Sequence, residues 1–579
     1  MRGLAELIGW EPSRTDRVLG HPATLDFPAE DVACARCGSS ATVYKTTRRT
    51  VVTLAQGRIE AREIQRICRG HPEPQVQRSR VLAELVPRGQ RYGYDLITRV
   101  GCLRFLELCQ RREIRARLSI RHGIELSEGT ISALSDRFLL HLGALHRDRV
   151  AALRQGMRGG YPLHIDGTHY QGSGGLFLCY NGWRGWVLHA GRIDSERIEE
   201  IEPIVEQTVS WFGRPVAVVR DQSSACGAAV AFLTDVGVPD LLCHYHVLKN
   251  LGKRLLHRAY RRLVALWRVH KGSSTLRALL RRLERADDPA AREVAAAVYW
   301  ILEGEGKTPP CFPFATPLAG RIERLLSVPQ HLGAFASART RLACKADLDE
   351  LGQLVHAVEA HGELQELLQR LHARKRLFDE ARAVFRLADP SNPPDPLLPD
   401  IQLLQYRDIE DRVDLWRRDL RRRLLPAKGD LRKAIEAVLE PLDTMHHHLF
   451  GHPSLSAPDG RVLHVVERTN NALEHLFSHQ AQDLRRRTGR KNLGRDLEEL
   501  PAEAALVHNL RDPLYVKLLA GSLADLPRAF ATTQPDAHPL RNRRHGLSKR
   551  RVASLRHKLP QHNPANQPTA PTTITATES

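Results

Sequence analysis

LHIDGTHY at residues 163–170, GLFLCYNGW at 175–183 and GWVLHAGRI at 185–193 follow one another with Gly-containing turns between them. Apolar, β-branched and aromatic residues dominate each run, so we predict three successive strands. Beyond them the hydrophobic spacing switches repeatedly between the helical and the strand period. This switching predicts helix, strand, helix, strand and helix in the runs 195–212, 215–222, 223–237, 238–246 and 247–260. The centre of the chain is therefore expected to be an α/β domain.

Three strands followed by helix, strand, helix and strand is the order of an RNase H-like α/β domain. We assign residues 159–260 to the first part of such a core and residues 461–530 to its last part. Between them, residues 261–460 predict a large all-helical insertion, because leucines such as Leu351 and Leu354 recur there at helical spacing. The expected fold class is an α/β RNase H-like catalytic core interrupted by an all-α insertion.

The charge of the chain points to a polyanionic partner. Its 579 residues include 86 Lys and Arg against 66 Asp and Glu, a formal net charge of +20. Such an excess of cations neutralises phosphates, so double-stranded DNA is the expected partner, with a basic but otherwise ordinary enzyme as the alternative. No run of ~18 uncharged apolar residues is present, and the first residues lack an apolar signal core. We therefore expect no membrane segment and a cytoplasmic location.

Residues 31–76 predict a zinc ribbon, which follows an N-terminal segment at 1–30. Two knuckles, C-x-x-C and C-x-x-H, offer the four ligands Cys34, Cys37, Cys68 and His71. The run between the knuckles is rich in Val, Thr and Ile, as a hairpin is. Zn²⁺ prefers four S or N ligands in a closed tetrahedron, and this set supplies them. The alternative is a group of unrelated buried thiols.

Residues 77–158 predict a helical, helix-turn-helix-like DNA-binding region. One helical pattern ends at His122-Gly123, and Ser127 is placed to cap the helix that follows. The residues expected to pack are Leu103, Leu106, Ile114, Leu118, Ile120, Ile131, Leu134 and Phe138. Helix, Gly-containing turn and capped helix is the outline of a helix-turn-helix, although any helical bundle can contain it.

Residues 531–579 predict a basic and disordered tail. The stretch from Arg541 to Lys558 holds eight Lys and Arg and no acidic residue. Such a run repels itself and binds phosphates, unless it serves only solubility. The residues after it contain too few apolar side chains to fold.

Asp166 and Asp221 each come at the end of a strand-like run. Carboxylates at the ends of two strands of one sheet can converge, and a cation between them relieves their repulsion. Hard oxygen ligands with open positions suit Mg²⁺. The alternative is that each aspartate closes a strand at a turn, where Asp is common.

Glu474 is the third candidate acid. Its window, VVERTNNALEHLFSHQAQDLRRRTGRKN at 465–492, passes from a loop into a helix whose apolar face is Leu473, Leu476, Phe477 and Leu484. Glu474 and Arg485 share a separate polar stripe, because 11 residues at ~100° each return almost to the same angle. The cations expected to contact DNA are Arg485, Arg486, Arg487, Arg490 and Lys491. Glu467, which precedes the helix, is the rival acid.

The order of these motifs resembles DDE transposases of the Mutator-like type and their bacterial insertion-sequence relatives. The likeness rests on DGT at Asp166, the strand-terminal Asp221, C-x-x-H at Cys243 and His246, and RTNNALE ending at Glu474. The spacing of 253 positions from Asp221 to Glu474 resembles that of such enzymes, which carry an all-helical insertion before their last acid. The resemblance covers roughly residues 160–500 and does not extend to the N-terminal ribbon.

The resemblance implies a transposase that cleaves transposon ends and joins them to target DNA. Two Mg²⁺ or Mn²⁺ ions held by Asp166, Asp221 and Glu474 are expected at the active site. The partners are then transposon terminal repeats and target DNA, with a homo-oligomer assembling on the DNA and a location at the bacterial nucleoid.

Other functions are also compatible with these residues. An RNase H-like nuclease or resolvase would use the same acids without the insertion, and a transposase-derived DNA-binding protein would have no need of them. Cys243 and His246 offer only two metal ligands, so core packing or substrate contact is the preferred role over zinc binding. An ATPase is disfavoured because GEGKT at 304–308 lacks the first Gly of a phosphate-binding loop, where Ile301 stands.

Overall fold

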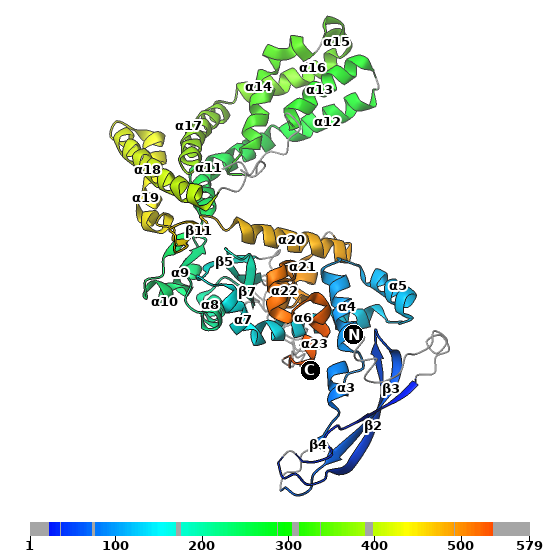
Figure 1. The fold of residues 1–579 in the computed structure, drawn as a ribbon. Helices are drawn as coiled ribbons and strands as arrows, with labels where there is room; N and C mark the ends of the chain where they lie inside the picture. Colours follow the sequence, from blue (N-terminus) through cyan, green and yellow to red (C-terminus); the bar gives the residue numbers. More distant parts are fainter. Residues whose placement is uncertain are drawn as a thin grey trace, which may run out of the picture. The chain divides into compact units, whose positions relative to one another are not determined.

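The computed structural model describes residues 23–535 except 35, 72–75, 169–174, 287, 304–311, 336, 388–397 and 491. The chain divides into two compact units (Figure 1). The first contains the described residues up to Asp148, together with 495–503 and those from Leu523 on; the second contains 149–494 and 504–522. The GEGKT segment and the basic tail lie outside the described residues. Among the helices described, none is long and apolar enough to cross a membrane.

The first unit contains a small sheet in the order β1-β3-β2, with β4 also paired to β3. Its strands are β1 (Ala23–Pro28), β2 (Thr42–Thr53), β3 (Gly57–Ile67) and β4 (Val76–Gln77). β2 and β3 form the predicted hairpin, which is antiparallel from Thr53↔Gly57 to Thr42↔Ile67. β1 pairs with β3 in parallel, so the predicted boundary at residue 30 is wrong: the sheet begins before it. The short helix α3 (Arg80–Leu85) packs its Leu82 and Leu85 against Val51 and Ile59 of the hairpin.

Helices α4 (Tyr94–Phe105), α5 (Arg111–His122) and α6 (Glu128–Asp148) complete the first unit with α21 (Gly494–Glu499), η2 (Leu523–Asp525) and α23 (Leu526–Ala531). The predicted outline is confirmed, because α5 ends at Gly123 with φ 63° and the Ser127 hydroxyl accepts from the N–H of Thr130. Phe138 of α6 packs between Phe105 and Phe530. Ile120, predicted to pack, is 84% exposed, because it lies on the outer face of α5.

The second unit contains a five-stranded mixed sheet in the order β7-β6-β5-β8-β9. Its strands are β5 (Pro162–Thr168), β6 (Gly175–Asn181), β7 (Trp186–Ile193), β8 (Ala217–Arg220) and β9 (Asp240–Leu242). β5, β6 and β7 are antiparallel neighbours, whereas β8 and β9 add in parallel beyond β5. Parallel neighbours need crossover connections, which are supplied by helix α8 (Ile198–Phe212) and by α9 (Ser224–Ala229) with α10 (Ala231–Thr234). α7 (Val150–Gly156) precedes the sheet.

The predicted order of strands and helices between 163 and 260 is present, but the helix predicted at 223–237 is two short helices, α9 and α10, and the strand predicted at 238–246 ends early. Residues 243–246, predicted as strand, begin helix α11 (His244–Val269), with Cys243 as its N-cap. β9 therefore has only three residues. The change matters for the site, because it places His246 on the first turn of a helix.

The predicted insertion is helical and has a continuous apolar core. After α11 it consists of α12 (Gly272–Arg285), α13 (Pro289–Glu303), α14 (Pro317–Phe335), α15 (Ala338–Ala343), α16 (Lys345–Glu359), α17 (Gly362–Val384), α18 (Pro399–Leu424) and α19 (Gly429–Leu449). Its end is not helical: β10 (Ser454–Ser456) and β11 (Val462–Val465) form a hairpin, so the prediction of helix up to residue 460 is wrong there.

The chain returns to the five-stranded sheet through α20 (Asn471–Thr488), η1 (Ala502–Arg511) and α22 (Pro513–Ala520). Val466, just after β11, is buried against Ala217, Val219 and Leu241 of the sheet. Asn509 exchanges two hydrogen bonds of 2.8 Å with the backbone of Val187 and so caps the outer edge of β7. These contacts place the start of α20 over the sheet that carries the first two candidate acids.

Candidate active site and metal centre

Asp166 lies on β5, and Asp221 directly follows the neighbouring parallel strand β8. β5 and β8 pair as Leu163↔Val218 and His164↔Val219, and each aspartate comes two residues after the second of these pairs. The charge of Asp221 raises the pKa of Asp166, so the two carboxylates lie near each other. Adjacent strands lie about 4.8 Å apart, which lets two such carboxylates act on one ligand.

Glu474 reaches the same place from the first turn of α20. Its Oε1 lies 3.2 Å from Nε2 of His246 on α11. Burial, together with the negative charges of Asp221 and Glu474, raises the pKa of Asp166 to about 7, although the opposing charge of His246 lowers it. The pKa of Glu474 is lowered: burial raises it, but the contact with His246 outweighs burial. The three predicted acids thus interact electrostatically in one cluster.

This acidic cluster is looser than a preformed metal cage. A compact metal site needs at least three Asp, Glu, His or Cys residues whose ligand atoms lie close together. Among the residues that the structure describes, the N-terminal Cys₃His set meets this condition, with its ligand atoms all within 4.8 Å of one another. Asp166 instead accepts a hydrogen bond of 2.8 Å from the N–H of Gly167, and Asp221 accepts one of 2.9 Å from Ser223. The negative charges of Asp221 and Glu474 nevertheless act on Asp166, and a divalent cation would neutralise charge in such a group of carboxylates.

Arg220 lies beside Asp221, and sequence reasoning did not single it out. It is the last residue of β8, and its guanidinium forms two hydrogen bonds of 2.7 Å with the buried carboxylate of Asp240. A third donor, Nη1, bonds the carbonyl of Asp221 at 3.0 Å. Gly227 leaves room for this arrangement, because a Cβ there would lie 3.1 Å from the guanidinium. Arg220 therefore holds the backbone that carries the second acid.

Cys243 and His246, the predicted core signature, both belong to this site. The Cys243 Sγ is buried and accepts a hydrogen bond of 3.2 Å from the N–H of Asn470. Burial lowers the pKa of His246, but Cys243 and Glu474 outweigh it and raise the pKa to about 10. The pair therefore joins α11 to the segment carrying the third acid: Cys243 packs in the core, and His246 contacts Glu474.

Glu467, the rival third acid, occupies a different position. Its Oε2 lies 3.2 Å from Nε2 of His164, which is 1% exposed. Gly182 closes this corner, since a Cβ there would lie 2.5 Å from the His164 ring and 2.6 Å from the Glu467 carboxylate. The charge of Glu474 raises the pKa of Asp166, whereas Glu467 contacts His164.

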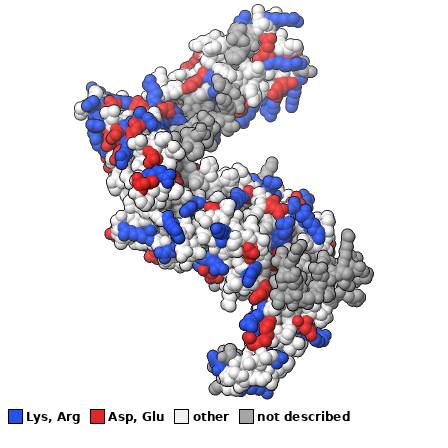
Figure 2. Space-filling model, in the orientation of Figure 1, with Lys and Arg blue, Asp and Glu red and all other residues white. Residues whose placement is uncertain are grey.

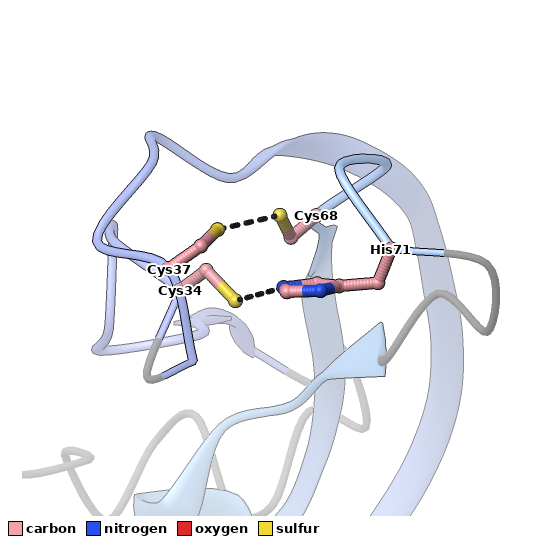
Figure 3. Close-up of side chains that lie close together, drawn as sticks. All are labelled: Cys34, Cys37, Cys68 and His71. Atoms are coloured by element: carbon pink, nitrogen blue, oxygen red, sulfur yellow. Dashed lines mark hydrogen bonds between the residues drawn. The ribbon is translucent and has the colours of Figure 1, made fainter.

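The four predicted zinc ligands lie together at the end of the β2–β3 hairpin (Figure 3). The Sγ atoms of Cys37 and Cys68 are 3.7 Å apart, and the Cys34 Sγ lies 3.4 Å from Nε2 of His71. In a tetrahedron with Zn–S bonds of about 2.3 Å and Zn–N bonds of about 2.05 Å, the S–S and S–N edges are ~3.8 and ~3.6 Å. The observed edges match both values, so this Cys₃His cluster can bind zinc.

The thiol chemistry of the cluster agrees with its geometry. Hydrogen bonds from the backbone N–H groups of Arg36 and Cys37 lower the pKa of Cys34 to about 6. Thiolates are the form in which cysteine binds metals.

Comparison with models of known protein families and with curated proteins gives no match to this sequence.

The predicted DNA-contacting cations differ in accessibility. Arg485, Arg486 and Arg490 are exposed, whereas Lys491 lies outside the described residues. The prediction that Arg487 contacts DNA is wrong. This residue is 7% exposed on the inner face of α20, and its Nε lies 3.4 Å from the carbonyl of Asp483, so a phosphate cannot reach it from outside. On the face in Figure 2, Lys and Arg alternate with Asp and Glu over the helical insertion rather than forming one basic surface.

Proposed function

We propose that this protein is a DNA transposase with an RNase H-like core, in which Asp166, Asp221 and Glu474 hold two Mg²⁺ or Mn²⁺ ions. The observation that carries the proposal is that Asp166 on β5 and Asp221 directly after the neighbouring parallel strand β8 interact with a glutamate from a helix 253 positions later in the chain. The sheet order β7-β6-β5-β8-β9 supports the RNase H-like assignment.

The donor set fits hard divalent cations. All three acids offer carboxylate oxygens. The pKa of Asp166 is raised first by burial and then by the negative charges of Asp221 and Glu474, which a cation would neutralise. When bound, such ions supply electrostatic stabilisation of both the attacking and the leaving oxygen in phosphoryl transfer. The protein's own groups hold the acids in place: His246 contacts Glu474, and Arg220 holds the backbone of Asp221.

The remaining parts of the chain suit a DNA substrate. The Cys₃His cluster and the α5–α6 outline lie in the first unit, where terminal-repeat recognition is proposed. The exposed Arg485 and Arg486 follow Glu474 on α20 and would contact the phosphate backbone. The helical insertion between β9 and α20 favours a transposase over an RNase H-like nuclease that lacks one. Assembly as a homo-oligomer on DNA is part of the same proposal.

The test uses purified protein with a duplex that carries the DNA flanking its gene, in Mg²⁺ or Mn²⁺. Asp166→Asn, Asp221→Asn and Glu474→Gln should each abolish cleavage while retaining DNA binding, because the acids hold metal whereas cations hold the phosphates. Glu440→Gln, an exposed carboxylate on α19, controls for the loss of one negative charge.

Three outcomes would contradict parts of the proposal. Cleavage by Glu474→Gln together with loss in Glu467→Gln would assign the third acid to Glu467. Cleavage without joining to a second duplex would make the protein a nuclease. Full cleavage by all three acid variants would refute the site altogether.

A further inference from the structure

Asn470 joins three parts of the candidate site through one buried side chain and its backbone. It is 0% exposed and stands immediately before α20. Its Nδ2 lies 3.0 Å from the carbonyl of Ile165, and its Oδ1 lies 2.9 Å from Nδ1 of His164. Its backbone N–H donates to the Cys243 Sγ at 3.2 Å.

The chemistry of the partners fixes the orientation of the Asn470 amide. A backbone carbonyl can only accept, so the group facing Ile165 must be the NH₂ donor. The remaining Oδ1 can only accept, so the Nδ1 of His164 must carry a proton and donate. Aspartate has no donor for Ile165, and a shorter side chain cannot reach both partners. Asparagine is therefore the residue type that satisfies both contacts.

These contacts lie next to Asp166 and Glu474, the first and third candidate acids in the chain. Ile165 directly precedes Asp166 in β5. The carbonyl of Asn470 accepts from the N–H of Glu474 at 3.2 Å, so the third acid is one helical turn from Asn470. Two hydrogen bonds thus connect the backbone at the first acid with the backbone at the third.

We propose that Asn470 is a positioning residue that sets the separation between Asp166 and Glu474 and thereby the affinity of the site for its divalent ions. The inference rests on the proposed function, because it assumes that these acids bind metal. It is supported by the packing around His164, whose other nitrogen faces Glu467 and whose ring leaves Gly182 no space for a Cβ. Because these groups are closely packed, His164 cannot move to compensate for a displacement of Asn470.

A purely structural role would give a different result from a positioning role. A structural role predicts lower stability with unchanged metal affinity once the variant is folded. Residues that orient metal ligands change metal affinity about 10- to 100-fold when they are substituted. Metal affinity measured without DNA therefore separates the two roles.

The experiment measures Mn²⁺ binding to full-length, zinc-loaded protein by electron paramagnetic resonance, at a temperature at which each variant is folded by circular dichroism. Asn470→Ala should lower the Mn²⁺ affinity about 10- to 100-fold. Asn470→Ser removes the same contacts but keeps a residue favoured at helix N-termini, so it remains informative if the alanine variant fails to fold. Asn471→Ala, the neighbouring exposed asparagine, is the control and should bind Mn²⁺ as the unaltered protein does.

Asp166→Asn makes the two levels of failure distinguishable. If the unaltered protein has no Mn²⁺ site that Asp166→Asn removes, the proposed function fails. If that site exists and both Asn470 variants bind Mn²⁺ with unchanged affinity, only the positioning role is overturned. An equal loss in Asn471→Ala would also overturn it, because the effect would then not depend on the Asn470 side chain.

Discussion

Arg220 and Asp221 are neighbours in the chain, but their side chains interact with different groups. Arg220 turns into the protein and pairs with Asp240, where the two side chains are 10% and 6% exposed. Asp221 instead acts through its charge on Asp166, whose pKa it raises. A buried ion pair contributes little net stability, but removing one partner leaves an uncompensated buried charge. The pair is therefore best understood as holding the end of β8 in place.

Asp240→Ala should lower the free energy of unfolding by about 3 kcal/mol, because Arg220 would stay buried without its partner. The double variant Arg220→Met with Asp240→Leu should lose much less, since it removes both charges. Glu436→Ala breaks an exposed pair with Arg432 and should cost at most about 0.5 kcal/mol. Urea denaturation of the four proteins measures this. Equal losses in the single and double variants would contradict a charge-based account.

Sequence reasoning found the acids but not the residues that hold them. Asp166, Asp221 and Glu474 carry local signals: a strand end for each aspartate and a helical stripe for the glutamate. Arg220 pairs with a residue 20 positions away, and Asn470 with residues about 305 positions away. Such pairings depend on which strands become neighbours, which no local pattern reveals.

His452 should make the stability of the second unit sensitive to acid. Burial, with the nearby charge of Arg468, lowers its pKa to about 3, and its Nε2 has no hydrogen-bond partner among the described residues. In the unfolded chain His452 binds a proton near pH 6.5, whereas in the folded chain it does so only near pH 3. Protonation therefore favours the unfolded chain, and the free energy of unfolding falls as the pH falls below 6.5. Between pH 7.5 and 5 the loss is about 2 kcal/mol.

His452→Phe, which keeps a ring against Tyr406, is the test of this sensitivity. The variant should show a smaller fall in unfolding free energy between pH 7.5 and 5 than the unaltered protein, as measured by denaturant titration at both values. Parallel pH profiles for the two proteins would assign the acid sensitivity to other groups.

At the scale of helices and strands, the periodicity of apolar residues predicted the elements whose contacts are close along the chain. The β2–β3 hairpin and the core helices were visible in the sequence because their contacts are close along the chain. β1 was missed because it pairs in parallel with β3, some 36 residues away. The start of α11 was missed because Leu241, Leu242 and Cys243 continue an apolar run, although only the first two belong to the strand.

The Cys₃His cluster should hold about one zinc per chain, because its ligand edges already match a tetrahedral site. Cys34→Ser and Cys68→Ser should each lose the metal and lower the melting temperature of the first unit, since a small ribbon depends on its ion. Cys102→Ser, a half-buried cysteine on α4 outside the cluster, should keep it. Metal analysis of purified protein decides this, and zinc retained in both cluster variants contradicts the ligand set.

At the scale of the whole chain, the insertion and the core are interdependent within the second unit. Helix α19 ends on the core, where the His448 ring lies 2.8 Å from the carbonyl of Asp240 and Leu449 accepts from His244. Arg468 donates to the carbonyl of Arg386, just beyond α17. The insertion thus contacts β9, the start of α11 and the segment that leads to the third acid. The sequence indicated an insertion but not these contacts, because they join positions more than 80 residues apart.

The stretch from Arg541 to Lys558 lies outside the described residues, and its role is tested from its charge. Eight cations without an acidic residue should bind DNA through phosphates alone, which weakens with salt. Deleting residues 541–579 should therefore lower affinity for gene-flanking and random duplex by similar factors. It should also flatten the plot of log affinity against log salt by ~0.9 for each phosphate that the stretch neutralises.

Fluorescence anisotropy from 50 to 200 mM salt on both duplexes measures this, with deletion of 559–579 alone as the matched control, because that deletion keeps every cation of the stretch. An unchanged slope after the longer deletion would leave the stretch with a role in solubility only. A loss confined to the gene-flanking duplex would instead assign sequence reading to it, because phosphate contacts weaken all sequences alike. Equal losses on both duplexes are the result that an electrostatic tail requires.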